Sequence, residues 1–512
     1  MKQDSIERTR TSSIFHHLFI PEGESLSSSL ILGFITLIAM MVRAFLINQP
    51  IQYDEAYTFI HYASQSLTAI LANYSAPNNH IFHTILVALA YHFFGGSPWI
   101  LRLPAFLAGV LMVPTAYLAA RRFFTRSQSL AAAAALAITP LLIEYSANGR
   151  GYTLLTLFAL LLTNFAGIII KKQTIAALIG YGITAALGFY TIPIFLYPMA
   201  GISLWLVVSY LIETNPWRDK VRKIIIFFLT CAIAGVLTLL LYSPVIFWGT
   251  GIASLVSNEI VESQNWFTFV ANLSPRLTNT ALNWMTGIAP AFRPLLLGGF
   301  AISLLFYRRV SNQTLPLQVF LVLGAFVFML IQRVVPLFRV WLYLDAFYMF
   351  FVAAGLAWLL DLFLKLFLSP HLTEKILGLL IILISLIYLG YSFQGLRVSI
   401  LQADDFPEEY AADYIKEHIQ PEDTLIALPP IDIQTAYYLA ITGIPFDRFY
   451  QPDHPVKIQN ALVLLRDNSK YQTPLSVLKY FELSREFVMS RAVLVYEYGH
   501  LKIYSIPARR VK

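Results

Sequence analysis

Long apolar runs alternate with short polar segments along most of the 512 residues. Helices of roughly 20 apolar residues match the thickness of a bilayer's hydrocarbon core. Eleven such runs are recognised, at residues 28–48, 99–120, 128–145, 151–170, 174–190, 192–212, 224–246, 291–307, 315–335, 338–361 and 375–393. The pattern therefore predicts a polytopic α-helical membrane protein with about 11 spans.

One further apolar segment, His80 to Phe94, is shorter than the others. As a helix its length is about 22 Å, less than the roughly 30 Å of the hydrocarbon core. Gly95-Gly96-Ser97-Pro98 closes it with a turn signal. We expect a juxtamembrane helix at the outer surface, with the N-terminus inside and the C-terminus outside. The main basic clusters then fall inside: Arg121, Arg122 and Arg126; Lys171 and Lys172; Arg218 to Lys223; Arg308 and Arg309; Lys365 and Lys375.

Composition agrees with this assignment, since 57% of the residues are hydrophobic, 13% are charged and the mean hydropathy is +0.64. The net charge of +7 does not indicate a nucleic-acid partner, because the basic residues lie in short clusters between apolar runs. The single cysteine, Cys231, allows no intramolecular disulfide and indicates no zinc site. The first apolar run lacks a cleavage pattern, so residues 1–27 are expected to be a cytoplasmic tail before an uncleaved anchor.

The chain becomes charged after Tyr391, which indicates a second domain. An amphipathic helix is expected near 407–420, strands at 424–428 and 461–465, and a hairpin at 492–506. Residues 397–512 are therefore predicted to form an extracytoplasmic α/β domain, and residues 28–396 a transmembrane domain that includes the outer loop 49–97.

The outer loop begins with two carboxylates, Asp54 and Glu55, and carries no Lys or Arg between Asn48 and Pro98. The stretch from Asp54 to Tyr74 is amphipathic and is predicted to be a helix in the interface plane. Asp54 is a candidate general base, with metal coordination or an N-cap as the alternatives. Glu55 either supports Asp54 or faces solvent.

Asn79, His80 and His83 form a second polar group in this loop. The two histidines are neighbours on a helix, but a zinc site needs further ligands. Hydrogen bonds to a phosphate or a sugar hydroxyl are as plausible, and Asn79 also suits a helix cap. No metal site is predicted, although a divalent cation such as Mg²⁺ or Mn²⁺ is not excluded as a cofactor.

Several further ionisable residues lie at the outer ends of the predicted spans. Arg150 is exposed by a Gly149–Gly151 turn and suits bidentate phosphate binding. The others are Arg102, Arg293, Arg333 and Arg339, for which anchoring at the level of the lipid head groups is the alternative. Asp345 lies one to two turns inside its span, where a carboxylate is costly and indicates function unless Arg333 or Arg339 pairs with it.

Four motifs together resemble the GT-C superfamily of membrane glycosyltransferases. They are Y-D-E-A-Y at 53–57, N-N-H-I-F-H-T-I-L at 78–86, F-F-G-G-S-P-W-I-L-R-L-P at 93–104 and A-R-R-F-F-T-R-S at 120–127. The resemblance is to the bacterial protein-mannosyltransferase-like and aminoarabinose-transferase-like group. Within it, the lipopolysaccharide-core galacturonosyltransferase type fits best.

The resemblance implies an inverting enzyme of a bacterial inner membrane that uses a polyprenyl-phosphate-linked sugar. The acceptor would be a glycolipid, a glycan or a protein on the outer side. By the same resemblance the catalytic base maps to Asp54, and the contacts to the donor phosphate map to His80 and Arg150, with Tyr152 following. Relatives often have Gln-Glu-Ala-Arg where this chain has Ala147 to Arg150, so their second acidic group is missing; Glu144 is a possible substitute.

The sequence therefore predicts a hexosyl- or pentosyltransferase. A transporter or flippase of lipid-linked sugars is the main alternative, but such proteins place polar sites near the bilayer midplane and often contain internal repeats. This chain concentrates its polar groups at the outer ends and shows no repeat. A non-catalytic membrane assembly protein is the other alternative.

Overall fold

The computed structural model describes residues 18, 23–256, 262–403, 407–453, 458–467 and 473–509, so most of the predicted tail 1–27 lies outside the described residues. Contacts divide the chain into two compact units. Residues 1–47, 71–83 and 102–397 form the first, and residues 48–70, 84–101 and 398–512 form the second. The long helix α20, Pro370–Ala403, ends in the second unit.

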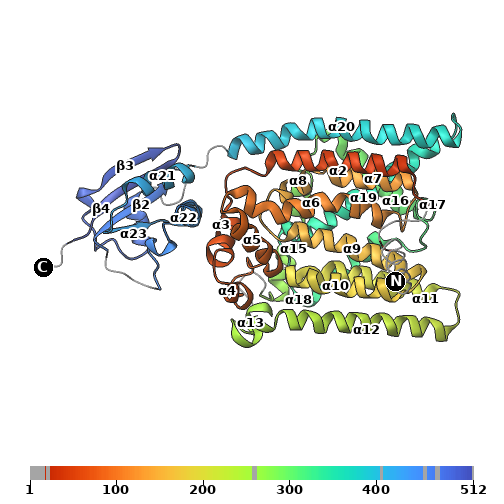
Figure 1. Ribbon diagram of the computed structural model, residues 1–512, viewed down its shortest axis with the longest axis horizontal. Coiled ribbons are helices and arrows are strands. Elements are labelled where there is room, and N and C mark those ends of the chain that lie inside the picture. Colours follow the sequence, from red (N-terminus) through yellow and green to blue (C-terminus); the bar gives the residue numbers. More distant parts are fainter. Residues whose placement is uncertain are drawn as a thin grey trace, which may run out of the picture. The chain divides into compact units, whose positions relative to one another are not determined.

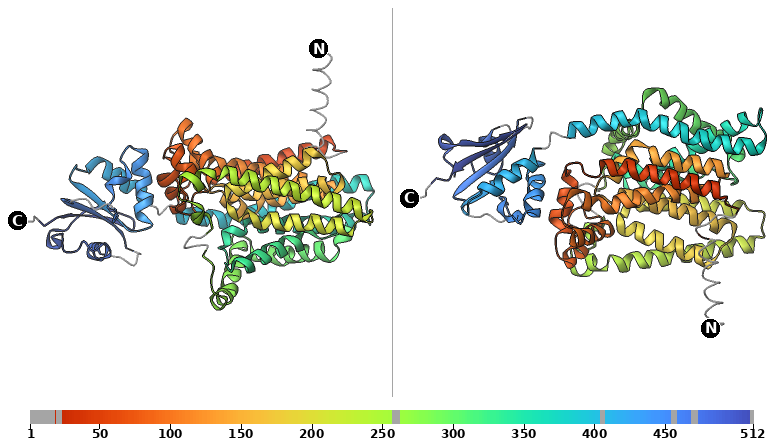
Figure 2. Two further views of the ribbon diagram at one scale, coloured as in Figure 1. Left: turned by 90° about the horizontal axis from the view of Figure 1, so that it is seen from below. Right: turned by 45° about the horizontal axis from the view of Figure 1, so that its top comes forward.

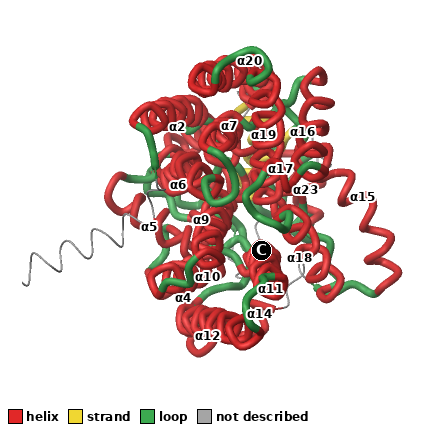
Figure 3. The backbone as a smooth tube through the Cα atoms, turned by 90° about the vertical axis from the view of Figure 1, so that its right-hand side faces the viewer, coloured by secondary structure: helices red, strands yellow, loops and turns green. Residues whose placement is uncertain are grey.

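The first unit is a bundle of helices that run side by side, with α12 and α20 on opposite sides (Figures 1 and 3). Its other helices are α2 Leu26–Leu46, α6 Pro98–Ala120, α7 Arg126–Ile138, α8 Pro140–Ser146, α9 Tyr152–Lys171, α10 Ile175–Thr191, η2 Pro193–Phe195, α11 Leu196–Ile212, α12 Trp217–Leu241, α13 Ser243–Trp248, α14 Ile252–Val256, α15 Trp266–Trp284, η3 Pro290–Phe292, α16 Arg293–Leu305, α17 Tyr307–Val310, α18 Leu317–Gln332, η4 Phe338–Trp341 and α19 Leu342–Leu364.

Helices occupy all of the predicted spans, and the protein is a multi-pass membrane protein. Among the described residues, seven helices are long and apolar enough to cross a bilayer, or up to eight if a bent pair is one span. Helices α10 and α18, together with the η3–α16 segment, are apolar but shorter, so the count of eleven stays a prediction. The basic residues Arg218 to Lys223 lie in the first turns of α12 rather than in a loop, because that helix begins at Trp217.

The bent pair is α7 and α8, which meet at an angle of 59°. Pro140 at the start of α8 lacks an N–H, so carbonyls at the end of α7 need other donors. The side chain of Arg43 in α2 supplies them: Nη1 donates to Ala137 O at 2.8 Å and Nη2 to Leu136 O at 3.1 Å. Its Nε donates to Ser146 Oγ at 3.1 Å. A fully buried arginine therefore stabilises the helix break.

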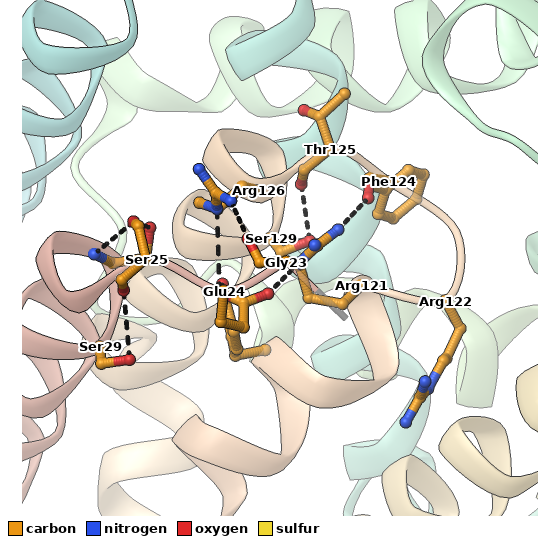
Figure 4. A network of polar contacts seen from close by, with 12 residues as sticks. Gly23, Glu24, Ser25, Ser29, Arg121, Arg122, Phe124, Thr125, Arg126 and Ser129 are labelled. Atoms are coloured by element: carbon orange, nitrogen blue, oxygen red, sulfur yellow. Dashed lines mark hydrogen bonds and ion pairs between the residues drawn. The ribbon is translucent and has the colours of Figure 1, made fainter. Parts of the chain in front are cut away.

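Ion pairs join the residue before α2's N-cap to the end of α6 and the start of α7 (Figure 4), and another joins α7 to α20. Arg121 Nε lies 2.6 Å from Glu24 Oε1, and Arg126 Nη1 lies 2.8 Å from Glu374 Oε1. Arg126 Nε also lies 3.8 Å from Glu24 Oε2. Two members of the basic cluster at 121–126 thus connect α2, α6, α7 and α20 at one end of the first unit.

The stretch 54–74 is not the continuous helix that the sequence predicts. It forms α3 Tyr53–Thr58, a π-helical turn η1 Phe59–Ala63, and α4 Leu67–Ala72. Ser64 Oγ donates to Phe59 O at 2.8 Å and Gln65 Nε2 donates to Ile60 O at 2.8 Å. These side chains take carbonyls that a continuing helix would use, which ends it before Leu67.

The second unit also contains a four-stranded sheet with helices on both faces (Figure 2). The strands are β1 Asp423–Ile426, β2 Asn460–Arg466, β3 Val493–Tyr498 and β4 Leu501–Pro507, in the order β1-β2-β4-β3. The β1–β2 pair is parallel, and the other two pairs are antiparallel. Alternation along β2 sends Leu462 and Leu464 into a core with α21 Glu408–His418 and α22 Ile431–Ile441. Val463 points into the core on the other face, where α23 Pro474–Tyr480 packs.

Helix α22 connects this sheet to the outer-loop residues of the same unit. Gln434 Nε2 donates to Ile51 O at 2.9 Å, and Ile51 N donates to the Tyr438 hydroxyl at 3.2 Å. The rings of Phe59 and Tyr437 meet edge to face at 5.3 Å. The segment 48–70, which contains Asp54, therefore packs against α22 and shares a core with the C-terminal residues.

We predict that Arg43→Met strongly destabilises the protein. The change leaves the Ala137 and Leu136 carbonyls without their donor in a buried place, which costs about 3 kcal/mol. Thermal unfolding of the purified protein measures the loss. Arg126→Gln is the control, because the partly exposed Arg126 pairs are worth about 1 kcal/mol or less. Equal losses in the two variants would contradict the prediction.

Candidate functional site

The clearest polar site in the first unit joins two segments about 70 residues apart. One is the loop before α5, Ile81–Phe94, and the other is the turn between α8 and α9. His80 in the loop is only 2% exposed, and its Nδ1 accepts a hydrogen bond from Gly151 N–H at 2.9 Å. Arg150 Nη2 lies 3.5 Å from His80 Nε2. The predicted residues His80 and Arg150 are therefore brought together by the fold.

The Gly151 contact decides what the His80 ring does. A neutral imidazole has one acceptor nitrogen and one N–H donor. Because Nδ1 accepts from Gly151, the proton of a neutral ring is on Nε2. Arg150 is also only a donor, so the 3.5 Å approach sets two N–H donors side by side. Such a pair suits one shared anionic acceptor.

Charge and burial keep these histidines neutral. Burial lowers the pKa of His80 well below its usual value, and electrostatic interactions with Arg150, His83 and Arg339 lower it further. Burial, followed by the charge of Arg150, lowers the pKa of His83 to about 3. Neither ring nitrogen of His83 has a hydrogen-bond partner in the described part of the chain. The positive charge near His80 thus comes from Arg150 and Arg339.

Aromatic and amide side chains hold this site in place. Tyr152 meets the His80 ring edge to face at 5.1 Å, and the Arg150 guanidinium lies 5.9 Å from the centre of the Tyr152 ring. The buried Asn79 side chain donates to Asn73 O at 2.7 Å and so orders the loop before His80.

Three other predicted residues make different contacts. Arg102 is buried and its Nη1 donates to Ile47 O at 3.0 Å, at the end of α2. Arg293 is exposed at the start of α16, where it donates to the carbonyls of Ile288 and Met285 at 3.3 and 3.4 Å. Asp345 in α19 is 1% exposed and pairs with neither Arg333 nor Arg339 among the described residues.

Asp54 and Glu55 belong to the second unit, in α3. The N-cap of that helix is Gln52, not Asp54 as in the alternative reading of the sequence. Glu55 is buried and its Oε2 accepts from Gln52 N–H at 2.9 Å, so it completes a capping box. Asp54, one position earlier, is half-buried in the first turn. The capping role is thus Glu55's.

A carboxylate that the sequence did not indicate lies near Asp54. Burial, then the charges of Asp432 and Asp54, raise the pKa of Tyr53, so both carboxylates act on one hydroxyl. Asp432 is in the first turn of α22, and burial raises its pKa to about 6. About 380 residues separate it from Tyr53, and only the α3–α22 packing brings them together.

The described residues contain no group of three or more His, Cys, Asp or Glu side chains that could hold a metal ion. Glu144, a possible substitute for the missing acidic group, lies in α8 and is exposed at its surface.

Comparison with protein families gives a partial match. The model of the family described as dolichyl-phosphate-mannose-protein mannosyltransferase matches residues 78–248. The matched range contains both the His80 loop and the Arg150 turn. No curated protein sequence matches the chain.

Solved structures show that the fold is shared over nearly the whole chain. ArnT from Cupriavidus metallidurans in the apo state is similar with a TM-score of 0.60 and 14% identity, over 94% of this chain and 98% of ArnT. ArnT bound to undecaprenyl phosphate gives a TM-score of 0.56, with the same identity and coverage. The apo oligosaccharyltransferase of Archaeoglobus fulgidus gives 0.52 at 15% identity, over 84% of this chain and 62% of that one.

We predict that Asp432→Asn stabilises the protein at neutral pH and not in acid. The Asp432 carboxyl has a pKa near 4 in the unfolded chain and about 6 in the folded protein. As the pH rises between these two values, the unfolded chain ionises first, so the folded protein loses stability. At pH 7.5 the neutral amide should therefore gain up to about 3 kcal/mol, and at pH 4 almost nothing. Thermal unfolding at both pH values measures this. Asp447→Asn, at an exposed carboxylate, should show no such gain; a pH-independent effect of Asp432→Asn would contradict the prediction.

Proposed function

We propose that the protein is an inverting glycosyltransferase that moves a sugar from a polyprenyl-phosphate donor to a hydroxyl acceptor at the outer face of the membrane. One observation carries the proposal: the buried Nε2–H of His80 and the Arg150 guanidinium, 3.5 Å apart, suit a single phosphate group. The partial family match, which covers both residues, and the fold shared with ArnT support it.

The leaving group of the proposed reaction is a phosphate, so the protein needs only to stabilise its negative charge. The acceptor oxygen attacks C1 of the sugar, the bond from C1 to the phosphate oxygen breaks, and the polyprenyl phosphate takes the bonding electrons. Arg150, Arg339 and the N–H of His80 stabilise the negative charge that develops on that phosphate. A neutral His80 with its proton on Nε2 donates throughout the reaction.

Asp54 is the proposed general base that takes the acceptor's proton. Glu55 holds the α3 helix that presents Asp54, because its carboxylate is used by the capping box. Asp432 adds a second carboxylate beside Tyr53. Relatives often carry an acidic residue in the segment that corresponds to Ala147 to Arg150, whereas Asp432 lies far from that segment in the sequence.

We further propose a bacterial inner-membrane protein with a cytoplasmic N-terminus and an extracytoplasmic C-terminal α/β domain. The acceptor would be a glycolipid, cell-surface glycan or protein, and the galacturonosyltransferase-type branch supplies the first sugars to test. Mass spectrometry of outer-surface glycans from cells with and without the protein identifies the sugar and its acceptor.

We predict that Asp54→Asn lowers transfer from a polyprenyl-phosphate-linked sugar at least about 100-fold, since a general base typically contributes 10²–10⁴-fold. The amide has nearly the same shape and cannot accept the acceptor's proton. Transfer by the purified protein, measured with a labelled donor, tests this, and Asp447→Asn controls for loss of charge in the same unit. Wild-type transfer by Asp54→Asn would remove Asp54 as the base. Binding of donor by the wild type without any turnover would favour a transporter.

We predict that Gly151→Ala lowers kcat/KM for the polyprenyl-phosphate sugar at least about tenfold. The change displaces the His80 N–H, and loss of one hydrogen-bond donor to a developing negative charge usually lowers the rate by more than tenfold. An added Cβ would lie 2.8 Å from Thr191 Cγ2 and 3.0 Å from His80 Nδ1, so the His80 ring must shift. Gly151 has φ of −73°, so the effect comes from contact and not from backbone strain.

Gly235→Ala is the matched control for this change. Gly235 lies within α12, and an added Cβ there would meet no heavy atom within 4 Å. Unchanged donor kinetics in Gly151→Ala, or equal losses in both variants, would contradict a role for the His80 contact.

A further inference from the structure

A second group of buried polar atoms lies in the first unit, around Asp345 in α19. Asp345 is 1% exposed, and its Oδ2 has no hydrogen-bond partner within the described residues. A carboxylate at this depth in a predicted span is costly to bury, so an unpartnered one calls for a functional explanation. Pairing with Arg333 or Arg339 was the alternative that the sequence left open, and neither residue pairs with Asp345 in the described part of the chain.

The groups around Asp345 come from three helices. Tyr348 is one turn further along α19, and Tyr388 belongs to α20; both hydroxyls interact electrostatically with Asp345. Trp284, the last residue of α15, stacks on Tyr348 with ring centres 6.2 Å apart and planes at 26°. The Tyr348 hydroxyl and the Trp284 Nε1–H also lack partners in the part of the chain described.

This group differs from the His80–Arg150 site in its chemistry. Among the described residues no arginine or lysine contributes to it; its atoms are those of one carboxyl group, two phenol hydroxyls and one indole N–H. Without a cation, this group does not suit a phosphate. Several hydroxyl groups on one small ring would satisfy both the acceptor and the donors, and the stacked Trp284 and Tyr348 rings offer apolar faces to C–H groups.

Aromatic rings that are only partly covered surround this group. Trp284, Tyr348, Phe292 and Phe300 are each half-buried. Phe292 packs on Tyr388 at 5.2 Å and Phe300 on Tyr348 at 5.2 Å. Helix α15, which ends at Trp284, projects from the side of the bundle in Figure 3, and its exposed face includes Phe267, Val270 and Leu282. A ligand carried by a membrane lipid is therefore the natural occupant.

We propose that Asp345, Trp284, Tyr348 and Tyr388 form a second binding site, which takes the hydroxyl groups of a pyranose head group carried by a membrane lipid. This inference rests on the proposed function only for the identity of the lipid-borne sugar, which is that of the donor or that of a glycolipid acceptor. Both sources share the same chemistry, so the experiment separates them.

Binding is measured without turnover, with the purified full-length protein in lipid nanodiscs. The probes are octyl glycosides with hexose, hexuronic acid and aminohexose head groups, below their micelle-forming concentrations. We expect at least one to bind the wild type, about tenfold more weakly to Asp345→Asn, and several-fold more weakly to Tyr348→Phe. Tyr307→Phe is the control, because Tyr307 is another buried tyrosine, at the start of α17. No binding by the wild type, or equal binding by all variants, would overturn the site.

Thermal unfolding distinguishes a ligand site from a structural carboxylate. Asp345→Leu removes an unpartnered buried carboxylate, so it should raise the Tm while abolishing glycoside binding. A lower Tm would show that Asp345 stabilises the fold and would overturn the proposal.

Turnover kinetics then assign the source of the sugar. A raised donor KM in Asp345→Asn with an unchanged acceptor KM identifies the donor sugar, and the reverse identifies the acceptor. If both KM values are unchanged, the site does not serve a substrate and the proposal fails. If the wild type shows no turnover, the proposed function fails, and the binding measurement still decides the site.

Discussion

The hydrogen bond from Gly151 N–H to His80 Nδ1 is the contact on which the candidate phosphate site depends. It joins two segments that are far apart in the chain, and it fixes the tautomer of a buried imidazole. Without it, Arg150 would lie beside a ring whose facing nitrogen is equally able to accept. With it, both groups are donors, and such a pair suits a single anion.

Burial is the second constraint, and it acts differently at each ionisable group. Arg43 is fully buried but donates to two carbonyls and a hydroxyl, so its charge is used to close the break between α7 and α8. That break leads directly into the turn that carries Arg150. Asp345 is buried as deeply and has no such use among the described residues. Arg43 therefore has a structural role, whereas for Asp345 we propose a ligand.

The two sites proposed in the first unit have complementary chemistry. The His80–Arg150 site offers donors and positive charge, as a phosphate requires, whereas the Asp345 group offers an acceptor, hydroxyls and aromatic faces, as a sugar requires. A lipid-linked sugar contains both kinds of group. The carboxylates of the second unit, Asp54 and Asp432, both act on the Tyr53 hydroxyl, and Asp54 is the proposed general base.

The sequence alone determined the features that depend on composition and local chain chemistry. Apolar length predicted the helices of the bundle, and glycines predicted the turns at Gly95 and Gly149 to Gly151. The outer loop indicated Asp54 and His80 as candidates, and the second turn indicated Arg150. It failed at 54–74, where Ser64 and Gln65 take backbone carbonyls and break the expected helix. Only the tertiary structure decided which nitrogen of His80 carries the proton and that Arg43 donates to the carbonyls at the α7–α8 break. It also decided that Asp432 lies near Tyr53 and that Asp345 Oδ2 has no hydrogen-bond partner among the described residues. These depend on contacts between residues far apart in the chain, which no local pattern encodes.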